Sequence, residues 1–198
     1  DAIWYLTGLD LGRLRASPQL ERFKKKGWEV LLLSDPVDEW VVMSLTEFDG
    51  VPLKSVARGD LPEEDADPIA EEARSQVEPF CGWLKAELTD LVADVRASRR
   101  LTDSPAVLVD ADHGMSANME RILRAARQDV GKARRTLEVN PEHPLVKRIA
   151  ALQKDGNEED ARTFGRLLLD YAQLAEGTIE DVPGFSARLS ALMQRAAG

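Results

Sequence analysis

The sequence predicts a small α/β unit with the element order βαβαβ, followed by an α+β domain that ends in successive helices. In the first part, apolar strand-like runs alternate with helical patterns, which favours a small, mostly parallel sheet. In the second part, strand-like runs come first and helical patterns dominate the end. An acidic, proline-bearing segment at 58–68 separates the two patterns. We therefore place the two domains at residues 1–62 and 63–198.

The first part contains three apolar runs with two helical patterns between them. Pro18 and Gly27 mark the start and the stop of the first helix. The run at 29–35 is apolar almost throughout, which is typical of a strand covered on both faces. In chain order, the predicted elements are a strand at 3–7, a helix at 18–26, a strand at 29–35, a helix at 36–45 and a strand at 51–56.

The second part begins with a long helix that Pro79 is expected to kink or divide. Two strands joined by the turn RLTD follow it. Gly177 stops one of the last helices, and Asp181 caps the next. In chain order, the predicted elements are a helix at 67–91, strands at 92–98 and 104–110, a helix at 116–126, a strand at 136–139 and helices at 144–153, 160–176 and 181–197.

The charge of the chain argues against a nucleic-acid partner. The sequence holds 26 Lys and Arg against 35 Asp and Glu, a formal net charge of −9. Binding to nucleic acid needs clustered basic side chains that neutralise phosphates. The short basic pairs 99–100 and 134–135, and acidic pairs such as Asp110 with Asp112, are predicted to lie on a solvated surface.

Cysteine content and hydropathy indicate a reducing compartment and no membrane-spanning segment. Cys81 is the single cysteine, which excludes an intrachain disulfide, and its apolar neighbours predict a buried position. No apolar run approaches the roughly 18 residues that a membrane helix needs, and no signal peptide is visible. The chain begins with Asp1 rather than Met, which we interpret as a sign that it is a piece of a longer protein.

Candidate catalytic and metal-binding residues are scarce. The sequence has no GxxxxGK[ST] loop, and TGLDLG at 7–12 lacks the dinucleotide-binding spacing. His113 and His143 have no second ligand at metal-binding spacing, so we expect neither a metal site nor a catalytic triad. The alternative is a small enzyme domain that binds a nucleotide or metabolite at the carboxyl ends of its strands, near 7–11 and 34–38.

Several large apolar residues could lie either in the core or on a binding surface. The helix at 116–126 and the residue before it carry an apolar stripe of Met115, Met119, Ile122 and Leu123. The pattern favours burial, because an amphipathic helix usually packs its stripe inward. An exposed stripe would suit adaptable binding, since methionine side chains are flexible. Trp40 offers the same choice.

The last two helices are apolar over more than one face. Such helices are covered by two partners, either within the chain or in a second copy. Two copies of the helix pair would form an intersubunit four-helix bundle with two-fold symmetry. The residues in question are Phe164, Leu167, Leu168, Tyr171, Leu174, Phe185, Leu189, Leu192 and Met193.

Five blocks of the sequence, in order, resemble the ninety-kilodalton heat-shock chaperone family, most closely its bacterial branch. They are LLLSDPVDEWVVMSLTEFDG (31–50), RLTDSPAVLV (100–109), HGMSANMERILRAA (113–126), LEVNPEHPLVKRI (137–149) and LLLDYAQLAEG (167–177). The resemblance implies that residues 1–62 are the C-terminal subdomain of the middle domain and that residues 63–198 are the C-terminal dimerisation domain. It also implies that the last two helices form the intersubunit four-helix bundle.

The resemblance further implies a molecular chaperone fragment that binds client proteins on an apolar surface between the arms of a dimer. The implied client-binding residues are Glu39, Trp40, Met43, Met115, Met119, Ile122 and Leu123. The implied dimer interface consists of the nine apolar residues named above for the last two helices. A purely structural dimerisation module remains an alternative, as does the small enzyme domain.

The implied partners are a second copy of the chain and unfolded or partly folded client proteins. The resemblance also implies a cytoplasmic location and is compatible with a bacterial DnaK-type chaperone as a partner. ATP and Mg²⁺ would bind in the family's N-terminal domain, so this fragment is expected to be no enzyme and to hold no cofactor. Eukaryotic cytosolic members end in EEVD, which docks tetratricopeptide co-chaperones. This chain ends in QRAAG, so that partner class is not expected.

Overall fold

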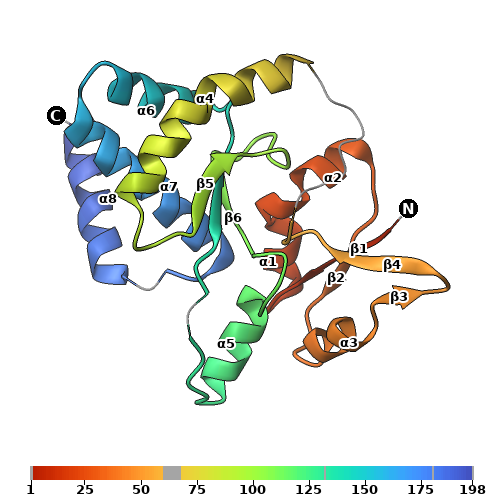
Figure 1. Cartoon of the computed structure of the whole chain (residues 1–198). Helices are drawn as coiled ribbons and strands as arrows, with labels where there is room; N and C mark the ends of the chain where they lie inside the picture. The colour runs from red at the N-terminus through yellow and green to blue at the C-terminus, as the bar shows by residue number, and fades with distance from the viewer. Residues whose placement is uncertain (1, 60–67, 132, 180, 198) are drawn as a thin grey trace.

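The computed structural model describes residues 2–59, 68–131, 133–179 and 181–197 and contains two separate sheets (Figure 1). The predicted domain boundary at 62/63 lies outside the described residues. The first sheet belongs to the N-terminal part of the chain and the second to the C-terminal part. We call these parts, residues 2–59 and 68–197, the first unit and the second unit.

The sheet of the first unit has the strand order β2-β1-β4-β3. The central strand β1 (Ile3–Thr7) pairs in parallel with β2 (Leu31–Leu33) and with β4 (Val51–Ser55), and β3 (Glu47–Phe48) pairs antiparallel to β4. Helices α1 (Leu11–Ala16), η1 (Pro18–Leu20), α2 (Glu21–Lys26) and α3 (Asp38–Ser44) connect the strands.

The core of the first unit lies between this sheet and helices α1, η1 and α2. Phe23 is buried, and Trp4 and Trp28 meet its ring edge-to-face at centroid distances of 5.1 and 5.7 Å. The prediction that the run at 29–35 forms a strand covered on both faces is wrong. Strand β2 is short and lies at the sheet edge, so Leu31 is exposed.

The sheet of the second unit has the order β5-β7-β6, with β5 (Asp94–Ala97) parallel and β6 (Ala106–Val109) antiparallel to the central β7 (Thr136–Val139). Helices α4 (Pro68–Glu87), α6 (Pro144–Lys154) and α7 (Glu158–Glu176) pack on one face. Helix α4 is a single helix with Pro79 inside it, so Pro79 does not divide it.

Two further helices lie outside this layer. Helix α5 (Ala117–Ala125) extends away from the second sheet toward the first unit, and α8 (Val182–Ala197) lies along the outer side of α7 (Figure 1). Asp181 caps α8 as predicted, because its carboxylate accepts the backbone N–H of Gly184 at 2.9 Å. Cys81 lies in the core of the second unit as predicted, where burial raises the pKa of its thiol to about 12.

The other face of the second sheet meets the first unit through a buried arginine. Arg100 is 1% exposed, and its guanidinium contacts the Glu138 carboxylate at 2.8 Å. It also donates to Gln19 Oε1 at 3.0 Å and to the carbonyl oxygens of Val56 and Gly59. The prediction of a solvated surface is therefore wrong for Arg100, because acceptors from both units satisfy its charge and its donors.

A second polar contact fastens α2 to the turn between β5 and β6. The Glu21 carboxylate accepts the backbone N–H groups of Thr102, Asp103 and Ser104 at 2.7, 2.8 and 3.1 Å. Burial acts to raise the pKa of Glu21, but these hydrogen bonds together outweigh it and hold the pKa below its usual value. The two units are thus joined by buried and half-buried polar side chains.

Candidate functional site

A groove of about 450 Å³ lies between α3 of the first unit and α5 of the second, and we call it the α3–α5 groove. The carboxyl-terminal part of the first sheet and the loop that precedes α5 complete its walls. The structure thus brings together two sequence segments that are more than 70 residues apart. Of the residues predicted to bind clients, Glu39, Trp40, Met43, Met115, Met119 and Leu123 line this groove.

Glu39 fixes α3 against the start of α5. Its carboxylate accepts a hydrogen bond from Ser116 Oγ at 2.9 Å and another from Asn118 Nδ2 at 2.8 Å. Ser116 also caps α5, since its Oγ accepts the backbone N–H of Met119 at 3.0 Å. Glu39 is buried. It was predicted as a client contact, but its side chain instead positions the two helices that form the groove.

The exposed apolar surface of the groove comes from both helices. Trp40 is 46% exposed, Met43 is 67% exposed and Met115, just before α5, is 38% exposed. Met119 is only 6% exposed, and Leu123 is half-buried. The burial that the amphipathic pattern favours is therefore confirmed for Met119, whereas Met115 has the exposure that a client contact would need. Ile122 is half-buried and does not line this groove.

Contacts from the segment after β4 hold the loop that precedes α5. Arg58 Nη2 donates to the carbonyl oxygen of Gly114 at 2.8 Å, and the Asp110 N–H donates to the Ala57 carbonyl oxygen at 2.9 Å. Gly59 has φ +56°, and a Cβ there would lie 2.5 Å from Asp112 Oδ1. The segment after β4 therefore approaches the loop after β6 closely, and this contact places Met115 at the groove.

The acidic and basic pairs near the loop are partly buried rather than solvated as predicted. Asp110 is buried, and burial raises its pKa against the opposing effect of Arg135. The Arg135 guanidinium lies beside Glu176 and 3.9 Å from Asp110 Oδ1. These charges are compensated by residues distant in the sequence, which allows their burial.

The described residues hold no group of three or more His, Cys, Asp or Glu side chains that could bind a metal ion. His113 lies in an exposed loop, and His143 caps α6 by accepting the Leu145 N–H at its Nδ1, at 3.1 Å. Within the part of the chain that the structure describes, no helix has both the length and the apolar character to cross a membrane.

The predicted dimer-interface residues differ in exposure: one is buried, four are half-buried and four are exposed. Leu168 is 1% exposed and belongs to the core of the second unit, so it cannot contact another copy. All sixteen residues of α8 are described, and none of them is buried. The exposed predicted residues are Tyr171, Leu174, Leu189 and Met193, and the half-buried ones are Phe164, Leu167, Phe185 and Leu192.

Ion pairs hold α8 on α7. Arg188 donates to both carboxylate oxygens of the buried Asp170, at 2.7 and 3.0 Å. Arg195, near the C-terminal end of α8, pairs with Asp160, near the N-terminal end of α7. Helix α8 therefore has a fixed place on α7, while Val182, Leu189 and Met193 remain exposed. We call the exposed apolar residues of α7 and α8 (Tyr171, Leu174, Val182, Leu189 and Met193) the α7–α8 face.

Comparison with known proteins assigns the chain to a family. The profile of the Hsp90 protein family matches residues 1–198. The chain is 48% identical over 202 residues to the chaperone protein HtpG of Chromobacterium violaceum and 45% identical over 199 residues to that of Polaromonas naphthalenivorans. The alignments cover 98% of the chain, which spans about 31% of the length of these curated relatives. The chain therefore belongs to the Hsp90 chaperone family.

Proposed function

We propose that this chain is the part of a molecular chaperone that binds client proteins and holds two copies together. The observation that carries the client-binding role is the α3–α5 groove, where Trp40, Met43 and Met115 are exposed on elements from two units. Clients would be unfolded or partly folded proteins. Nucleotide hydrolysis, with ATP and Mg²⁺, would reside in the part of the relatives that this chain does not cover.

The chemistry of the groove supports binding of varied apolar segments. Methionine side chains are unbranched and polarizable, so Met43 and Met115 can adapt to side chains of different shape. Trp40 adds a large, rigid contact area, which is typical of residues that contribute most of the binding energy at interfaces. Glu39 and Arg58 engage groups of the protein itself, so the exposed surface of the groove is mainly apolar.

The α7–α8 face supports the dimer. Leu174 on α7 and Val182, Leu189 and Met193 on α8 are exposed apolar side chains on two adjacent helices. Two copies that meet through the same face would bury these residues with two-fold symmetry and form a four-helix bundle. Light scattering should give twice the chain mass of 21.9 kDa. A monomer at micromolar concentration would exclude the dimer.

The client-binding role is tested by an aspartate substitution in the groove and a matched one elsewhere. Met43→Asp should weaken binding of a fluorescently labelled, permanently unfolded protein, because a charge placed among apolar contacts must lose its hydration. Leu145→Asp is the control, since Leu145 is also exposed but lies on α6, outside the groove. Equal affinity of both variants and the wild type would exclude the groove as the client site.

The remaining functional assignments follow from this proposal. The protein would work in the cytoplasm, and a bacterial DnaK-type chaperone would be a partner in client transfer. A purely structural dimerisation module would show dimerisation without client binding. The alternative of a small enzyme domain required a ligand site at 7–11 and 34–38. Thr7 and Leu9 line a second pocket, whereas residues 34–38 do not.

A further inference from the structure

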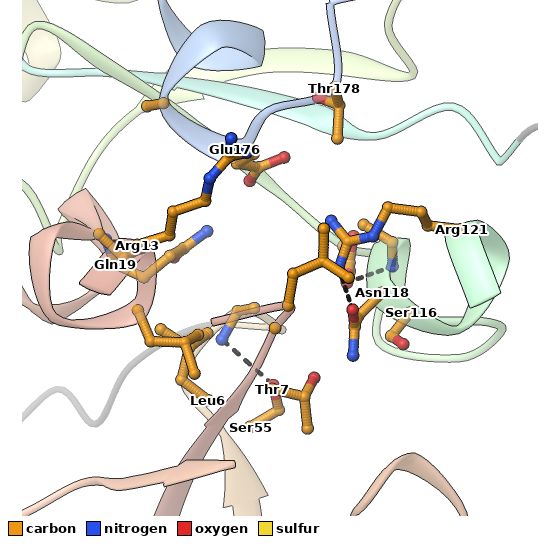
Figure 2. A pocket seen from close by; sticks show the side chains of 18 of the residues that line it. Leu6, Thr7, Arg13, Gln19, Ser55, Ser116, Asn118, Arg121, Glu176 and Thr178 are labelled. Atoms are coloured by element: carbon orange, nitrogen blue, oxygen red, sulfur yellow. Dashed lines mark hydrogen bonds between the residues drawn. The ribbon is translucent and has the colours of Figure 1, made fainter. Parts of the chain in front are cut away.

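A second, smaller pocket lies between the two units, next to the α3–α5 groove, with which it shares Thr7, Ser55 and Ser116. Its volume is about 90 Å³, and it is lined by the end of β1, by α1, by the start of α5 and by the end of α7 with the segment that follows it. Figure 2 shows Arg13 extending from α1 and Arg121 extending from α5 on opposite sides, with Glu176 and Thr178 along a third. The pocket therefore draws polar side chains from both units.

The charges that line the pocket do not balance. Arg135 is compensated, because its guanidinium pairs with Glu176 and lies 3.9 Å from Asp110. Arg13 has an exposed ion pair with Asp10, at 3.4 Å, which is a weak interaction in water. Arg121 has no ion pair with a carboxylate in the described part of the chain. Three arginines thus line the pocket with two carboxylates.

Arg121 carries the clearest sign of a missing partner. Its Nη2 donates to Asn118 Oδ1, but its Nε is buried and has no hydrogen-bond partner among the described residues. A buried donor without an acceptor is costly, and such donors usually meet water or a ligand. Burial, and secondly the positive charge of Arg13, lower the pKa of Arg121 against the smaller opposing effects of Glu176 and Glu39. Both effects would be relieved by an anion between the two guanidinium groups.

We propose that this pocket binds a small oxyanion, namely inorganic phosphate or the phosphoryl group of a small phosphate ester. Guanidinium groups suit tetrahedral oxyanions, because their N–H donors match the spacing of phosphate oxygens. Arg121 and Arg13 would donate from opposite sides of the anion, and the Thr7 hydroxyl lies at the same pocket. The volume is below the roughly 300 Å³ at which pockets for drug-sized ligands begin, so a bound nucleotide does not fit inside.

The test is calorimetric titration of the intact chain with inorganic phosphate, against sodium chloride at the same ionic strength. A second titration with glycerol 3-phosphate distinguishes free phosphate from a phosphate ester. We expect saturable binding of at least one of the two, and none of chloride. Arg121→Gln and Arg13→Gln should each weaken binding about tenfold or more, since each removes a charge-assisted hydrogen bond.

The matched control is Arg15→Gln, which removes the same charge from an exposed residue of α1 that does not line the pocket. This variant should bind phosphate with the wild-type affinity. Circular dichroism would establish that each variant is folded, and Arg13 is exposed enough that its substitution tests the site even if Arg121→Gln unfolds the chain. Absence of saturable binding would overturn the proposal, as would an equal loss of affinity in Arg15→Gln.

Discussion

Replacing Arg100 by Met should destabilise the chain because Arg100 links the two units through buried hydrogen bonds. The substitution keeps much of the side-chain volume but removes the charge and its donors. Glu138 is itself buried and loses its contacts with Arg100 at 2.8 and 3.3 Å. Gln19, Val56 and Gly59 each lose a hydrogen-bond donor.

The expected loss in the free energy of unfolding is about 3 kcal/mol. Breaking a buried ion pair by removing one partner typically costs about 3 to 5 kcal/mol, because the other charge stays buried. The lower end applies, since Glu138 keeps a contact with Arg96 at 2.9 Å and a hydrogen bond from Ser98 at 2.8 Å. For an m-value of about 2 to 3 kcal/mol per molar urea, the unfolding midpoint should fall by about 1 to 1.5 M.

Urea unfolding followed by tryptophan fluorescence measures this loss. Trp4 and Trp28 pack in the core of the first unit and Trp83 packs against that of the second, so the signal reports on both. All variants are compared at one protein concentration, because self-association raises apparent stability. The control is Arg99→Met, whose side chain is 37% exposed and whose ion-pair contact with Glu71 is long, at 3.9 Å.

Arg99→Met should change the unfolding free energy by about 0.5 kcal/mol or less. A second variant, Arg100→Met combined with Glu138→Leu, should recover part of the loss, since it also removes the buried carboxylate that Arg100 compensates. Equal midpoints for Arg100→Met and Arg99→Met would refute the assignment of Arg100 as the link between the units.

Four further predictions follow from particular contacts. Glu21→Gln should lower stability by about 1 kcal/mol at neutral pH, through weaker hydrogen bonds to the turn at 102–104. The folded-state pKa of Glu21 lies below 4.5, so its contribution is present above pH 4.5 and is lost as the pH falls through the folded pKa. Urea midpoints of both proteins from pH 7 to 3 should therefore converge, and a constant difference would contradict this. Leu168→Arg should unfold the second unit, measured by circular dichroism, because it buries an unpaired charge in the core. A variant that is folded but monomeric would instead show that Leu168 lies in the dimer interface. Leu189→Asp should keep the fold but give 21.9 kDa in light scattering, and a persistent dimer would place the interface elsewhere. Asn118→Ala should destabilise the α3–α5 contact by about 1 to 3 kcal/mol, because Glu39 then loses a donor; an unchanged melting temperature would refute that role.

Element positions could be predicted well from apolar periodicity and from helix signals. The strands at 3–7 and 136–139 have the predicted bounds, and Gly177 and Asp181 mark helix ends as expected. Helix α1 was missed, since its six residues are too few for a periodic pattern, and β3 has only two residues. Short elements depend on neighbours in space, which a local pattern does not contain.

The burial of individual side chains was harder to predict. Arg99 and Arg100 are adjacent, but only Arg100 is buried, because its acceptors come from residues 19, 56, 59 and 138. Met115 and Met119 belong to one apolar stripe in the sequence, yet Met119 lies on α5 and is buried, whereas Met115 precedes the helix cap Ser116 and is exposed. For Arg100, partners distant in the sequence decide the burial, and for Met115 the position of the helix start does.

The groove itself could be predicted only as two separate clusters of residues. The resemblance to the family pointed to Trp40 and Met43 on one side and to Met115 on the other. The hydrogen bonds of Glu39 to Ser116 and Asn118, which bring these clusters together, left no signal in the sequence. A carboxylate next to an exposed tryptophan is equally typical of a solvated helix face.

The central claim is that elements of both units form a single client site. Site-specific photo-crosslinking tests it most directly, with a benzoylphenylalanine in place of Trp40, Met115 or, as the control, Leu145. We predict that the Trp40 and Met115 positions crosslink to the same segment of an unfolded client protein and that the Leu145 position does not. Crosslinks from Trp40 and Met115 to unrelated client segments, or an equal yield at Leu145, would contradict a shared site in the α3–α5 groove.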